Sequence, residues 1–166
     1  AFTTYNTSTT HKLYLYIMNN SSSIASAQGP VSGQITSGSW FYVTGVYDGT
    51  DIKVYINGVE KGTTSHSGNL DTTVSNLVSG KGLGGSQYYI DGNIDEVRLS
   101  GQAHSADWIL TEFNNQNSPS TFFTFNTEET LSVGWYDNAW SYRQKITIDS
   151  AKVANTDQVN FPVYVD

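Results

Sequence analysis

Cysteine is absent from this chain of 166 residues. Without it the fold has no disulfides, and no metal site can use thiolate ligands. Basic residues are also scarce, with 8 Lys and Arg against 15 Asp and Glu and a formal net charge of −7. Nucleic-acid-binding proteins need basic side chains to displace phosphate counterions, so nucleic acid is not an expected partner.

Long apolar runs are missing as well, because no stretch approaches the roughly 18 apolar residues of a membrane-spanning helix. We therefore expect no membrane insertion. Charged residues make up only 14% of the chain, while 11 Tyr and 4 Trp suit half-buried strands. A polar, weakly charged surface of this type is common in secreted β proteins, so we expect an extracellular or cell-surface location. The chain opens at Ala1, and we expect a processed product or a piece of a longer polypeptide.

The clearest local pattern is a pair of hairpins between residues 40 and 58. Residues 40–47 and 52–56 are rich in aromatic and β-branched side chains, and the steps Asp48-Gly49 and Asn57-Gly58 supply turns with φ > 0. Residues 12–18 alternate aliphatic and aromatic side chains, which predicts a strand with its aliphatic face in the core. We further expect loops at 19–30 and 62–68, short or weak strands at 31–35, 74–83 and 87–90, strands at 94–99, 122–125, 142–149 and 161–165, and a short helix near 105–114.

Three motifs carry a family resemblance. They are W-x-x-V-x-x-x-Y-D-G-T followed by Y-I-N-G-V from Trp40 on, G-N-I-D-E-V-R-L at 92–99, and a helix that begins S-A-D-W-I at Ser105. Together they resemble the laminin-G-like family of concanavalin A-type jelly rolls. The resemblance implies an all-β jelly-roll β-sandwich over residues 1–118, with an extracellular binding or structural role.

The C-terminal part has a different character. Residues 119–134 are expected to be a linker or a strand. Residues 135–166 contain W-x-Y-R-x-x-I-T-I and F-P-V-x-V, and they resemble the first strands of a prokaryotic domain of unknown function that stands beside laminin-G-like modules in surface proteins. This segment is expected to be a partial second domain or a set of donated strands.

The resemblance also implies missing strands, because the family carries a strand group before the position matched by Lys12 and residues 1–10 are too short and polar to replace it. A sandwich that lacks strands exposes apolar side chains and unpaired backbone groups along an edge. Either the C-terminal strands fold back into the gap, or strands of one copy fill the groove of the next, which by head-to-tail addition gives a filament or surface layer. We favour self-association between copies, and the residues expected to carry it are Tyr142, Ile146, Ile148, Phe161, Val163 and Val165.

Two binding sites are expected. In similar jelly rolls the aspartate of I-D-x-V-R ligates a structural calcium, which makes Asp95 the metal candidate with Asp91 and Asn93 near enough to assist; the alternative is that Asp95 caps a bulge or pairs with Arg98. An aromatic surface would stack on sugar rings of a glycan, although strand aromatics also serve as ordinary packing. The residues of this surface are Tyr14, Tyr16, Trp40, Tyr88 and Tyr89.

Catalysis is not expected. Jelly-roll glycosidases need two carboxylates that face one cleft, and their E-x-D-x-x-E strand is absent from this sequence. The adjacent pairs Asp95-Glu96 and Glu128-Glu129 would point to opposite faces of a strand. The sequence therefore predicts a non-enzymatic structural or adhesive module. The alternatives are a carbohydrate-binding lectin-like module and an accessory domain of a glycoside hydrolase.

Overall fold

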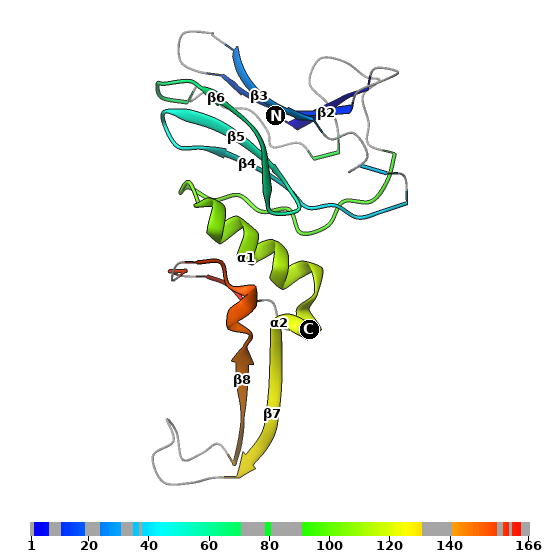
Figure 1. Ribbon diagram of the computed structural model, residues 1–166, viewed down its shortest axis with the longest axis vertical. Helices are drawn as coiled ribbons and strands as arrows, with labels where there is room; N and C mark the ends of the chain where they lie inside the picture. Colours follow the sequence, from blue (N-terminus) through cyan, green and yellow to red (C-terminus); the bar gives the residue numbers. More distant parts are fainter. Residues whose placement is uncertain are drawn as a thin grey trace. The chain divides into compact units, whose positions relative to one another are not determined.

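Strands dominate the part of the chain that the computed structural model describes, which comprises residues 2–6, 11–18, 24–30, 35–36, 38–70, 79–80, 91–130, 141–155, 158–159 and 161–163. The predicted all-β class is confirmed, since all three sheets are antiparallel and α1 is the one helix there that exceeds four residues. No helix within these residues is long and apolar enough to cross a membrane. The chain forms two compact units, residues 1–106 and 107–166 (Figure 1). The boundaries expected after residues 118 and 134 stay a prediction.

The first unit contains two three-stranded sheets. One has the order β1-β2-β3, with β1 (Phe2–Asn6), β2 (His11–Met18) and β3 (Ile24–Pro30). The other has the order β4-β5-β6, with β4 (Val43–Tyr47), β5 (Asp51–Ile56) and β6 (Val59–Ser65). The turn between β5 and β6 places Asn57 at φ 51° and Gly58 at φ 77°, as a two-residue hairpin turn requires. The hairpin predicted from Asn-Gly is therefore present.

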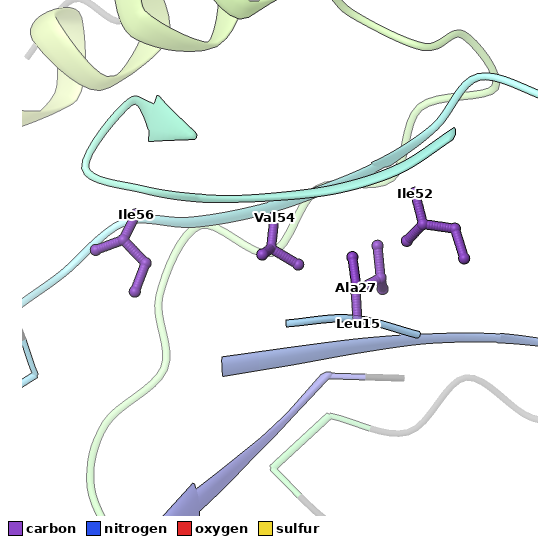
Figure 2. Close-up of a cluster of buried hydrophobic side chains, with 5 residues drawn as sticks. All are labelled: Leu15, Ala27, Ile52, Val54 and Ile56. Carbon is purple, nitrogen blue, oxygen red and sulfur yellow. The ribbon is translucent and has the colours of Figure 1, made fainter. Parts of the chain in front are cut away.

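The core of the first unit lies between these two sheets. Figure 2 shows Ile52, Val54 and Ile56 of β5 pointing toward Leu15 of β2 and Ala27 of β3, and all five are buried. The period of two in β5 sends these three side chains to one face. This packing of two sheets is the predicted β-sandwich, and the aliphatic side of β2 faces its core at Leu15.

The second unit consists of α1 (Ala106–Asn117), α2 (Pro119–Phe122), the two-stranded sheet of β7 (Phe123–Thr130) and β8 (Tyr142–Ile148), and the 3₁₀ turn η1 (Ser150–Lys152). Pro119 is at the start of α2. The first N–H groups of a helix have no acceptor within the helix, so the missing N–H of proline costs no hydrogen bond there. The helix predicted near residues 105–114 is confirmed as α1 and runs three residues further.

Two strands form where the sequence predicted none, and a third runs further than predicted. Residues 1–10 were judged too short and polar for a strand, yet Phe2–Asn6 pairs with β2, because five residues rich in Phe, Thr and Tyr suffice for an edge strand. The predicted loop at 19–30 contains β3, whose Gly-Pro end is tolerated because β3 is an edge strand. The loop predicted at 62–68 is wrong for residues 62–65, which belong to β6. The hairpin turn at Asn57-Gly58 brings this polar strand beside β5.

The strand predicted at 94–99 is not formed, and the described residues of the one predicted at 161–165 are not in a strand. Residues 93–100 have no regular secondary structure, and Glu96 has φ 51°, which bends the backbone out of the extended conformation. Residues 161–163 are likewise outside any strand. Alternating apolar residues indicate that a segment can pair, but pairing also needs a neighbouring strand. The short strands expected at 74–83 and 87–90 lie almost wholly outside the described residues.

Candidate functional site

The two tyrosines of β2 form an aromatic pair on the first sheet. Leu15 between them is buried in the core, so the alternation of the strand places Tyr14 and Tyr16 on the opposite face. Their rings are nearly parallel, with centroids 5.6 Å apart and an interplanar angle of 11°. Because the rings stack on each other, a ligand would meet their outer faces and hydroxyl ends.

The other predicted sugar-stacking residues do not extend this pair within the described part of the chain. Trp40 lies just before β4 and is 69% exposed, and the structure gives no ring contact between it and either tyrosine. Tyr88 and Tyr89 lie outside the described residues. Two of the five predicted aromatic residues therefore lie side by side, as the period of a strand requires, and the sugar-binding surface stays a prediction.

The β4–β5 turn holds a carboxyl group whose pKa is strongly perturbed. Oδ1 of Asp48 accepts hydrogen bonds from the N–H groups of Thr50 and Asp51, at 3.0 and 2.8 Å, and from the Thr50 hydroxyl at 2.7 Å. Oδ2 accepts from Nζ of Lys53 at 2.8 Å. The bond from Lys53, followed by those from Thr50 and Asp51, holds the pKa of Asp48 well below its usual range. The carboxylate is therefore occupied in shaping the hairpin.

Tyr55 on the neighbouring strand has the opposite kind of shift. Burial, and then the nearby charge of Glu60, raise the pKa of the Tyr55 hydroxyl. Its hydroxyl donates to Oε2 of Glu60 at 3.3 Å. This hydrogen bond ties the buried Tyr55 of β5 to the exposed Glu60 of β6.

Asp95 lies on the exposed segment of residues 91–100. Its Oδ1 accepts a hydrogen bond from the N–H of Glu96 at 2.9 Å, and Glu96 pairs with Arg98 at 2.9 Å. Calcium takes six to eight oxygen ligands, but no group of three or more His, Asp or Glu side chains gathers anywhere in the described ranges. The carboxylates described there do not make a calcium shell, and the Asp95 site stays a prediction.

The predicted assembly residues all belong to the second unit. Tyr142, Ile146 and Ile148 share one face of β8 and are 59%, 41% and 41% exposed. Their strand pairs with β7, which places Ile148 opposite Phe123 and Ile146 opposite Phe125. Among the residues that the structure describes, β8 therefore pairs with β7. Val165 lies outside the described residues.

An apolar groove of about 370 Å³ adjoins the end of this ribbon. It is lined by Thr111, Phe122, Ile148, Val153, Gln158, Phe161 and Val163, three of which the sequence had assigned to assembly. The Phe161 ring packs edge-on against Trp108 at 5.3 Å and lies 6.3 Å from Phe122. Val153, Gln158, Phe161 and Val163 therefore form one wall of the groove.

Two residues of α1 that the sequence analysis missed hold this wall in place. The Thr111 hydroxyl accepts a hydrogen bond from the N–H of Ala154 at 3.0 Å, and Nδ2 of Asn114 donates to the carbonyl of Lys152 at 2.8 Å. Their spacing of three residues puts both on one face of the helix. That polar spacing was the available signal, although nothing in the sequence identified the segment bound there.

Comparison with known proteins supplies one match. Residues 2–110 match the laminin-G-like family model described as the concanavalin A-like lectin/glucanases superfamily. No curated protein and no solved structure matches the chain.

Proposed function

The chain belongs to the concanavalin A-like lectin/glucanases superfamily, and from this premise we propose that it is a non-enzymatic, extracellular structural or adhesive β-sandwich module that assembles with copies of itself through β-strands. Family membership covers the sandwich. The polar, acidic composition supports the location, and the second unit supports the mode of assembly.

The observation that carries this proposal is the β7–β8 sheet, which has two strands in the described part of the chain. Each of the seven residues of β8 is exposed, although Tyr142, Ile146 and Ile148 give it an apolar face. An isolated two-stranded sheet is at best marginally stable in water. Added strands would complete hydrogen bonding along it and reduce the exposure of its backbone.

A second exposed apolar segment supports the same function. Ile94, Val97 and Leu99 are 46%, 58% and 78% exposed in residues 93–100, which pair with no strand in the part of the chain described. Exposed apolar side chains grouped in this way mark interaction sites. Two such regions in one chain suit a protein that contacts other polypeptides.

The absence of catalysis belongs to the proposal, because the superfamily includes glucanases. Its support is that three of the described carboxylates are engaged with neighbouring side chains: Asp48 with Lys53, Glu60 with Tyr55, and Glu129 with Arg143. Incubation with soluble β-glucans should release no reducing sugar. Hydrolysis that is lost on replacing one carboxylate would contradict the proposal.

Light scattering coupled to size-exclusion chromatography tests self-assembly. The wild-type mass should rise with concentration, and Ile146→Glu should lower it by placing a charge on the exposed face of β8. Val59→Glu is the matched control, because Val59 is 51% exposed on a strand of the first unit. A monomer at all concentrations would remove the self-assembly proposal.

A lectin-like function is the second candidate, favoured by the stacked Tyr14–Tyr16 pair on the outer face of β2 and by the exposed Trp40. Affinity electrophoresis in gels that contain common polysaccharides would detect it as retardation. Tyr16→Ala and Trp40→Ala should then abolish the retardation, while Val59→Ala should leave it unchanged. Equal mobility in every gel would eliminate this candidate.

A further inference from the structure

The two outer edges of the β7–β8 sheet differ in how open they are to another strand. The register shifts between Phe125 and Glu128, so β7 contains a bulge opposite β8. A bulge protects a strand edge from pairing. β8 has no bulge over its seven residues, and no other strand pairs with it in the described portion of the chain. The outer edge of β8 is therefore the accessible one.

The backbone of β8 has a definite polarity across this edge. The N–H of Asp149 donates to the carbonyl of Phe122 at 2.8 Å, on the β7 side. Because backbone groups alternate in direction along a strand, the odd-numbered residues 143–149 hydrogen bond toward β7. The N–H and C=O groups of residues 144, 146 and 148 then point to the outer edge.

Size excludes an endless sheet built by repeating this ribbon. If each copy added its two strands to one continuous sheet, neighbouring copies would be spaced about 10 Å apart. A compact body of the 60 residues in 107–166 is expected to be about 27 Å across. Neighbouring copies would collide, so pairing at β8 must close on itself, as a two-fold symmetric antiparallel pair does.

Charge then selects the register of that pair. In an antiparallel pair, two directly facing residues either both hydrogen bond to each other or both do not. A two-fold symmetric pair is therefore centred on one residue that faces the same residue of the other copy. In a register centred on Gln144, Arg143 would face Lys145 of the other copy. In a register centred on Lys145, the lysines of the two copies would face each other. Both registers place like charges together. Centring on Ile146 places Arg143 opposite Asp149 and Lys145 opposite Thr147, over the longest stretch free of like charges. The arginine already reaches Glu129 on its other side, at 2.6 Å.

We propose that β8 pairs with β8 of a second copy, antiparallel and centred on Ile146, to give a four-stranded sheet of order β7-β8-β8-β7 across two chains. The partner is thus a second copy of this chain. This inference rests on the proposed self-assembly and names the strand and register that carry it.

A cysteine scan reads the register directly, because the chain has no native cysteine. Facing Cα atoms lie about 5.5 Å apart, within disulfide reach, whereas residue 145 or 147 would lie roughly 8 Å from its own copy. Under mild oxidation of the full chain, Ile146→Cys should form a covalent dimer at least roughly tenfold faster than Lys145→Cys or Thr147→Cys, because pairing raises the effective concentration of that thiol alone. All three side chains are exposed, so each variant should fold.

The outcomes separate this inference from the proposed function. A dimer by light scattering together with selective cross-linking at residue 146 supports both. Assembly with cross-linking fastest at 145 or 147, or equally fast at all three, overturns the register while self-assembly stands. A monomer that none of the variants cross-links overturns both.

Discussion

Truncating Ile52 tests whether the two sheets of the first unit share one core. Its side chain is fully buried and points from β5 toward Leu15 and Ala27 of the other sheet (Figure 2). Replacing a buried Ile by Ala removes three carbons and leaves a cavity, at a typical cost of about 2–5 kcal/mol. A loss of about 3 kcal/mol corresponds to a fall of roughly 12 °C or more in the melting temperature of a unit of this size.

Urea unfolding followed by circular dichroism at the β-sheet band measures this loss. Val59→Ala is the control, because that side chain is half exposed on β6 and its removal should change stability by less than about 0.5 kcal/mol. The sharper measurement is a double-mutant cycle of Ile52→Ala with Leu15→Ala. Residues in contact show coupling of about 0.5–3 kcal/mol, so strict additivity of the two losses would refute the sandwich packing.

Three further predictions address the turns and the metal. Gly49→Ala should destabilise the protein by about 1 kcal/mol, because Gly49 has φ 94° in open space, whereas Gly101→Ala, also in open space, should be close to neutral in thermal unfolding. Because the pKa of Asp48 is lowered in the folded protein, its carboxylate stabilises the fold at pH values above the ordinary aspartate pKa, and this stabilisation is lost as the pH falls below about 4. Asp48→Asn should therefore flatten the acid limb of the profile of stability against pH. If Asp95 helps to bind calcium, EDTA should lower the melting temperature of the wild type but not of Asp95→Ala; no change in either would reject the site.

The sequence predicted most reliably the features that a few adjacent residues determine. The Asn57-Gly58 hairpin followed from the preference of these residues for positive φ, and both adopt it. The strand period placed Tyr14 and Tyr16 on the face opposite Leu15. Helix α1 followed from the S-A-D-W-I start at Ser105. In each case the physical cause lies within one element.

Features that depend on a distant partner could not be read in this way. Strand β3 has a loop-like composition and forms because β2 lies beside it, in a register that begins with Met18 opposite Ile24. Residues 93–100 have strand-like composition and remain irregular. The hydrogen bonds from Ala154 to Thr111 and from Asn114 to Lys152 span about forty residues. Pairing is a property of two segments, and a single sequence specifies the partner only weakly.

The energetics of β8 pairing indicate what kind of assembly this chain would make. The Ile146-centred register adds about six backbone hydrogen bonds, each with a net value near 1 kcal/mol. Association costs roughly 4–15 kcal/mol in lost translational and rotational freedom, so backbone pairing alone gives at most a weak dimer. Burial of Ile146 beside its copy and the Arg143–Asp149 pairs would add to it, the latter by at most about 1 kcal/mol each at an exposed edge. Such a contact becomes effective where copies are held close together, because tethering raises their effective concentration. A module that is displayed in many copies on one surface is therefore the setting in which this strand edge would act.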